Sequence, residues 1–103
     1  YQSLDAKFIK NREATFFFKA AGDSMVPTLF PGEILVVDRS LTHFDRRVCI
    51  VVWNHELICK RVFLRPDHVI LRSDNRKYQD IQVNDPECAF VWGVVVARAG
   101  EVH

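Results

Sequence analysis

A chain of 103 residues is long enough for one small domain with a single hydrophobic core and too short for two. Its residues are 49% hydrophobic and 26% charged, which is typical of a soluble globular protein. The 14 basic residues are balanced by 13 acidic ones, and the resulting net charge of +1 excludes a broad electrostatic attraction to nucleic acid or anionic lipid. Any role at DNA is therefore expected to be indirect, and no membrane contact is expected.

The first segment of the chain is expected to form a short helix. Ser3 can cap a turn or two in which apolar side chains recur at helical spacing, at Leu4, Phe8 and Ile9. We expect residues 1–13 to form this N-terminal arm and residues 14–103 to form the folded domain.

Six segments rich in β-branched and aromatic residues follow, bounded by Pro, Gly, Asn and Asp. They predict strands at residues 14–20, 33–39, 48–53, 56–65, 68–72 and 90–97. Short strands at this spacing indicate a mainly β, antiparallel architecture. The intervening stretch from residue 72 to residue 80 is interpreted as a polar loop.

The stretch GDSMVPTLFPGE, residues 22–33, is poor material for a helix or a strand because its prolines and glycines break both. It places much rigid backbone around one hydroxyl, that of Ser24. Alone, such a serine is usually a turn or capping residue. It becomes a candidate nucleophile only if a base lies close enough to remove its proton.

A candidate base comes from the stretch VCIVVWNHELICKRV, residues 48–62. If Asn54-His55 is a two-residue turn, Trp53 pairs with Glu56 and Cys49 lies opposite Lys60. Strand alternation then makes Lys60 the lone cation on an apolar face. Loss of hydration there would lower the pKa of the amine, whereas a lysine that extends to water would keep it.

The other reactive residues predict no site. Three cysteines (Cys49, Cys59, Cys88) cannot all pair within one chain and none lies in a CxxC spacing, so we interpret them as reduced thiols in a cytoplasmic protein, with Cys49 in the core. The four histidines (His43, His55, His68, His103) lack the spacing of metal ligands. No metal or cofactor is expected, and the longest apolar run is too short to span a membrane.

The two stretches around Ser24 and Lys60 together resemble a known family. GDSMVPTLFPGEILVVDRSL followed by ELICKRV is similar to the serine–lysine autopeptidase domain of the LexA and UmuD type. The likeness continues in ATFFFKAAGDSM, in DNRKY and in VWGVVVA, and so spans nearly the whole chain. The 36-residue separation of Ser24 and Lys60 is close to that of the family. Within it, the processed UmuD branch is the most similar, because a short arm precedes Ala14-Thr15.

The resemblance implies a mechanism for the domain at residues 14–103. Ser24 would be the nucleophile and neutral Lys60 the general base of a self-cleaving serine peptidase. The backbone N–H groups of Asp23 and Ser24 would hold the oxyanion, and Met25 and Pro27 would shape the wall beside the nucleophile. Cleavage in the family occurs at Ala-Gly or Cys-Gly in an upstream arm.

The resemblance also implies a fold and partners. We expect a small, strongly curved antiparallel sheet of the LexA and UmuD C-terminal type, assembled as a homodimer. A RecA-type recombinase filament would stimulate cleavage, and the trimmed dimer would bind an UmuC-like error-prone DNA polymerase for translesion synthesis in SOS mutagenesis. Two alternatives remain open. One is the C-terminal domain of a LexA-type or phage-type repressor, and the other is a soluble protease similar to signal peptidases, which share the Ser-Met-x-Pro-Thr-Leu motif.

Overall fold

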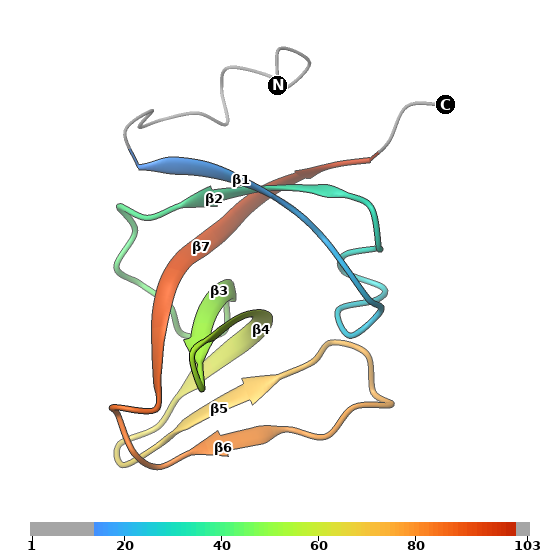
Figure 1. Cartoon of the computed structure of the whole chain (residues 1–103). Helices are drawn as coiled ribbons and strands as arrows, with labels where there is room; N and C mark the ends of the chain where they lie inside the picture. The colour runs from blue at the N-terminus through green and yellow to red at the C-terminus, as the bar shows by residue number, and fades with distance from the viewer. Residues whose placement is uncertain (1–13, 101–103) are drawn as a thin grey trace.

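The computed structural model describes residues 14–100, which form one antiparallel sheet (Figure 1). Its seven strands are β1 (Thr15–Lys19), β2 (Ile34–Asp38), β3 (Val48–Trp53), β4 (Glu56–Leu64), β5 (Val69–Arg72), β6 (Ile81–Val83) and β7 (Ala89–Ala99). Strands such as ILVVD and VCIVVW consist almost entirely of residues that favour extended backbone. The predicted mainly β, antiparallel architecture is confirmed.

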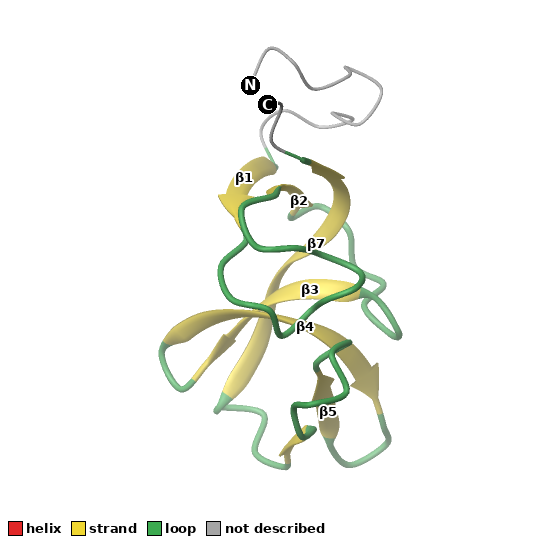
Figure 2. Ribbon diagram, turned by 90° about the vertical axis from the view of Figure 1, so that its right-hand side faces the viewer, coloured by secondary structure: helices red, strands yellow, loops and turns green. Residues whose placement is uncertain are grey.

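The strand order across the sheet is β1-β2-β7-β3-β4-β5-β6, so the last strand of the chain lies in its interior. β7 has 11 residues; its second half pairs with β2 and its first half with β3. It therefore runs the length of the molecule and joins β1 and β2 to the lower strands of Figure 1, which are β3 to β6. The side view shows β1 and β2 at one end of the molecule and β5 at the other (Figure 2).

The resemblance predicted a strongly curved sheet, and this prediction is wrong, because the sheet is open and not strongly curled. The edge strands β1 and β6 have only five and three residues and lie at opposite ends of the strand order. No pairing between them draws the two edges together, as closure would require. The sheet instead bends locally beside β7, at register shifts between Val36 and Val37 and between Ile50 and Val51.

All six predicted strands are present, with ends within two residues of the predicted ones. The strand that the sequence did not predict is β6, which pairs with β5. Only three residues long, it is too short for alternation to stand out from the polar segment before it. The helix expected near Ser3 lies outside the described residues.

Apolar side chains form two clusters on the two faces of β3, as strand alternation requires. One cluster includes the anchors of the turn that carries Ser24; its buried members are Met25, Leu29, Leu35, Val37 and Ile50. The other lies among the lower strands and the start of β7; its buried members are Cys49, Val51, Val62, Leu71, Val83 and Val94. Cys49 is fully buried, so its predicted core position is confirmed.

The hairpin of β3 and β4 has the predicted register. Trp53 pairs with Glu56, and Cys49 lies opposite Lys60. The two turn residues have positive φ, 49° at Asn54 and 68° at His55, as a two-residue turn matched to the twist of the strands requires. This turn fixes the position of Lys60 along β4.

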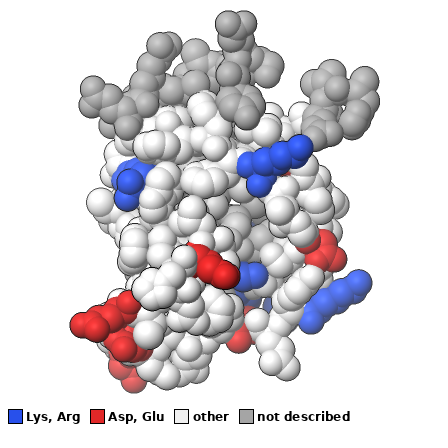
Figure 3. Space-filling model, viewed as in Figure 1, with Lys and Arg blue, Asp and Glu red and all other residues white. Residues whose placement is uncertain are grey.

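On the face in Figure 3, basic groups lie apart from one another, acidic groups gather at the lower left, and most of the remaining surface is uncharged. No basic patch is visible on that face. Between residues 14 and 100, no helix has the length and apolar character needed to cross a membrane.

Candidate active site

Ser24 is half-buried on a turn whose following residues pack into the core. Gly22, at the start of the turn, has φ of 72°, a conformation that side-chain-bearing residues rarely adopt. Thr28 N–H donates to the Met25 carbonyl over 2.8 Å, and the side chains of Met25 and Leu29 are buried. The turn therefore holds Ser24 at the surface on anchored backbone.

Lys60 extends from the middle of β4 and is half-buried. Burial lowers the pKa of its amine, because desolvation disfavours the ammonium form; the neighbouring Cys59 thiol opposes this shift. The ring of Tyr78 has its centroid 5.8 Å from Lys60 Nζ. Lys60 therefore has a larger neutral fraction than a lysine in water.

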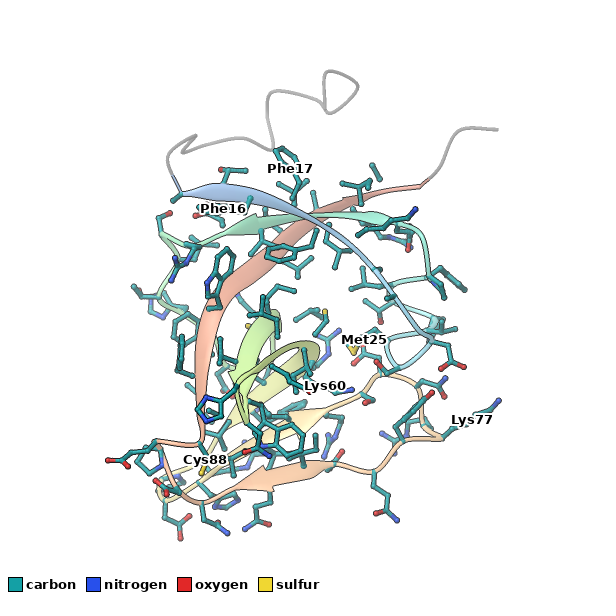
Figure 4. The ribbon with its side chains drawn as sticks, viewed as in Figure 1. Phe16, Phe17, Met25, Lys60, Lys77 and Cys88 are labelled. Carbon is teal, nitrogen blue, oxygen red and sulfur yellow. The ribbon has the colours of Figure 1, made fainter. Side chains whose placement is uncertain are left out.

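Ser24 and Lys60 line the same cavity, whose volume is about 280 Å³. Figure 4 shows the Lys60 side chain extending from β4 toward Met25, whose side chain comes from the serine turn. Most other lining residues are apolar, among them Phe18, Leu35, Ile50 and Ile58. A serine and a partly desolvated lysine on one apolar cavity are the groups that nucleophilic catalysis without histidine requires.

The hydrogen-bond partner of Lys60 Nζ is a residue that the sequence interpretation did not include. Nζ lies 2.8 Å from Ser73 Oγ, and Ser73 is buried. Within residues 14–100, Ser24 Oγ makes no hydrogen bond to Lys60. Counting outward from Pro66-Asp67 as a two-residue turn would have placed residue 73 opposite residue 60, the same reasoning that placed Cys49 there.

The loop after β5 holds the serine turn. Asn75 N–H donates to the Ser24 carbonyl, and the Asn75 side-chain amide donates to the Asp23 carbonyl, both over 2.9 Å. The Tyr78 hydroxyl donates to the Asp23 carboxylate, and Asp74 N–H contacts Met25 Sδ at 3.5 Å. The segment DNRKY, noted in the sequence only for its resemblance, therefore positions the backbone on both sides of the Ser24 peptide.

Asp74 links this loop to β4. Its carboxylate accepts two hydrogen bonds from the Arg61 guanidinium, at 2.9 and 2.8 Å, and a third from the Thr28 hydroxyl. The hydrogen bond from Arg61 lowers the pKa of Asp74, and burial of the carboxyl opposes the shift. Asp74 therefore stays ionised and connects the strand that carries Lys60 to the serine turn.

The two N–H groups predicted to hold an oxyanion lie in the serine turn. No residue between 14 and 100 accepts a hydrogen bond from the backbone N–H of Asp23 or Ser24, whereas the carbonyls of both residues are engaged by Asn75. These donors are thus available to a ligand. Met25 lines the cavity as predicted, whereas Pro27 is exposed and is not among the lining residues.

The thiols of Cys49 and Cys59 are poor nucleophiles. Burial raises the pKa of Cys49 to about 12 and that of Cys59, which lines the cavity, to about 11. In the described part of the chain, no three His, Cys, Asp or Glu side chains come together as metal ligands would.

Comparison with known proteins finds relatives that match most of the chain. The chain is 34% identical to the protein SamA of Salmonella typhimurium over 95 residues, which are 91% of this chain and 65% of SamA. It is 32% identical to the protein MucA of Salmonella typhimurium over 89 residues (84% and 60%). It is also 32% identical to the LexA repressor of Syntrophotalea carbinolica over 82 residues (79% and 41%). The chain thus spans roughly 40 to 65% of the length of these relatives.

The sequence pattern of the Peptidase S24-like family matches residues 1–96, nearly the whole chain. The resemblance to the LexA and UmuD type is thereby confirmed. This chain belongs to the Peptidase S24-like family.

Proposed function

We propose that this chain is the self-processing serine peptidase domain of an SOS mutagenesis protein of the UmuD type. The observation that supports this most directly is the shared cavity of Ser24 and Lys60, in which burial favours the neutral amine. The match covers 60% of MucA and 65% of SamA but only 41% of a LexA repressor of similar identity, which favours this branch of the family.

In the proposed reaction, Lys60 Nζ takes the Ser24 hydroxyl proton while Oγ attacks a peptide carbonyl. The carbonyl oxygen becomes an oxyanion that accepts hydrogen bonds from the N–H groups of Asp23 and Ser24. When the C–N bond breaks, Lys60 gives its proton to the leaving amine and an acyl ester remains on Ser24. Water then attacks the ester, Lys60 takes a proton from that water, and the released Oγ regains its proton.

The proposed substrate is an arm of the same protein that carries an Ala-Gly or Cys-Gly pair. In this proposal residues 1–13 are the part of the arm next to the domain, and residues 14–103 are the peptidase domain. The apolar cavity wall supports a substrate with small or apolar side chains before the cut bond, because charged ones would lose hydration there.

The proposed role after cleavage is binding. A RecA-type recombinase filament would stimulate the cleavage, and the trimmed protein would then form a homodimer and join an UmuC-like error-prone polymerase in the cytoplasm. The apolar residues that β7 leaves exposed, Phe90 at 57% and Val96 at 38%, support an interface on this strand. The net charge of only +1 supports contact with DNA through a partner only.

A second candidate is the self-cleaving domain of a LexA-type repressor, because the chain is also 32% identical to a LexA repressor. The chemistry at Ser24 and Lys60 would be the same, but cleavage would separate the domain from a DNA-binding half. A helix-turn-helix upstream in the full reading frame would favour this candidate over the first.

The first candidate is tested by complementation of damage-induced mutagenesis in cells that lack the activity. Two forms are compared, the 103-residue chain alone and the same chain behind an arm with an Ala-Gly pair, each with and without Ser24→Ala. We expect Ser24→Ala to abolish mutagenesis only in the form with the arm, because the chain alone needs no cleavage. Equal loss in both forms would contradict the proposal and favour a protease that acts on other proteins.

A further inference from the structure

Ser73 lies immediately after β5, in the position that faces Lys60. The pairing of Arg61 with Arg72, continued by one residue in antiparallel register, places residue 73 opposite residue 60. Side chains at opposite positions of antiparallel strands lie on the same face of the sheet. The 2.8 Å contact between Lys60 Nζ and Ser73 Oγ is therefore a consequence of the strand register.

A neutral amine has two N–H bonds and one lone pair, and only the lone pair can remove a proton. When Ser73 Oγ accepts one N–H, rotation about the last bond of the lysine is restricted and the lone pair is left for another direction. Building on the Ser24–Lys60 function proposed above, we propose that Ser73 is a positioning residue that turns the Lys60 lone pair toward Ser24. Ser73 itself does not touch the substrate.

The neighbours of Ser73 fix it in place from both sides. Asp74 is bound to Arg61, the residue after Lys60, and Asn75 is bound to the Ser24 carbonyl. Three consecutive residues thus contact the base, the strand that carries the base, and the turn that carries the nucleophile. With only 3% of Ser73 exposed, water cannot easily replace its hydroxyl when it is removed.

Few other groups around Lys60 titrate in the useful pH range. Cys59 beside it and Cys49 opposite it have pKa values of about 11 and 12. The hydrogen bond to Asp23 raises the pKa of Tyr78, whose ring faces the amine. A rate that rises with pH and levels off below the pKa of an exposed lysine therefore reports on Lys60.

The test is the rate at which a fluorophosphonate modifies Ser24, measured by intact-mass spectrometry at a series of pH values up to this plateau. In this reaction the Oγ–P bond forms, the P–F bond breaks, fluoride leaves, and Lys60 takes the proton. We expect Ser73→Ala and the nearly isosteric Ser73→Cys to lower the high-pH plateau roughly 10- to 100-fold, because a misplaced base is inefficient. Ser73→Thr, which keeps the hydroxyl, should retain most of the rate. Thermal unfolding checks that each variant is folded.

The pH midpoint separates positioning from a change in basicity. In Ser73→Ala the ammonium form of Lys60 loses a hydrogen-bond acceptor, so the pH midpoint of the rate should stay where it is or move to lower pH. The rate at the high-pH plateau should then fall even though the neutral fraction of Lys60 is no smaller. A plateau within about twofold of the unmodified chain in the folded Ala or Cys variant would overturn the inference, as would a Thr variant as slow as Ala. If Ser24 is not modified at all, or Lys60→Ala does not slow it, the proposed function fails and this inference with it.

Discussion

Arg61 and Asp74 form a bidentate ion pair, with nitrogen–oxygen distances of 2.9 and 2.8 Å, directly beside the candidate base Lys60. The side chain of Asp74 is only 13% exposed and that of Arg61 is 29% exposed, so the pair is poorly accessible to water. It joins β4 to the loop that holds the serine turn. Stability and site geometry therefore depend on the same contact.

Asp74→Asn should lower the free energy of unfolding at pH 7 by about 1–3 kcal/mol, because it weakens hydrogen bonds to a partly buried charge. The folded-state pKa of Asp74 is lowered, chiefly by the hydrogen bond from Arg61. The stabilisation is thus present above the unfolded pKa of about 3.9 and is lost as the pH falls through the folded value.

Urea unfolding of both proteins from pH 7 down to pH 2 measures this difference. Asp80→Asn is the matched control, since Asp80 pairs with Arg72 at an exposed position, and it should cost less. A constant difference between the Asp74 variant and the unmodified chain at every pH would contradict the assignment.

Gly93→Ala should destabilise the fold where β7 passes β2. A Cβ at this position would lie 2.6 Å from Val37 Cγ1, and Val37 is fully buried and cannot move aside. We expect a loss of about 1–3 kcal/mol, as for other overpacked core positions. Gly100→Ala is the control, because a Cβ there meets nothing within 4 Å. Equal stability of the two variants in chemical denaturation would show that the contact is relieved at little cost.

His55→Gly should stabilise the hairpin that positions Lys60. His55 has φ of 68°, a conformation that costs side-chain-bearing residues roughly 1 kcal/mol and costs glycine little. The expected gain is up to about 1 kcal/mol, and Asn54→Gly should give less, because asparagine tolerates this conformation. Thermal unfolding decides between the two, and a lower melting temperature for His55→Gly would contradict the argument.

The sequence predicted the position of Lys60 because a two-residue turn and strand alternation fix the register of β3 and β4 locally. The same reasoning applied to Pro66-Asp67 would have identified Ser73. The hydrogen bond from Asn75 to Asp23 could not be predicted in this way, because it joins residues 52 positions apart and depends on the path of the whole sheet. Local patterns therefore locate the base and the nucleophile, while the contacts that hold them together arise from tertiary structure.

The proposed homodimer predicts that Phe90→Arg makes the chain monomeric. Phe90 is 57% exposed on β7, and a charge there would lose hydration in an interface. Sedimentation equilibrium at about 50 μM, a concentration suited to a modest interface, should show a dimer for the unmodified chain. Phe30→Arg, an equally polar change at an exposed loop residue outside β7, should remain dimeric. A monomeric unmodified chain would contradict the proposal.

The most direct test of the Ser24–Lys60 peptidase is self-cleavage of the chain behind an arm with an Ala-Gly pair, followed over pH. Burial lowers the pKa of Lys60, so the neutral fraction and the cleavage rate should rise with pH and level off below the pKa of an exposed lysine. Ser24→Ala and Lys60→Ala should each abolish cleavage without unfolding the domain, while Lys77→Ala, at an exposed lysine, should cleave normally. Full cleavage by the Lys60→Ala protein at neutral pH without added amine would contradict the account.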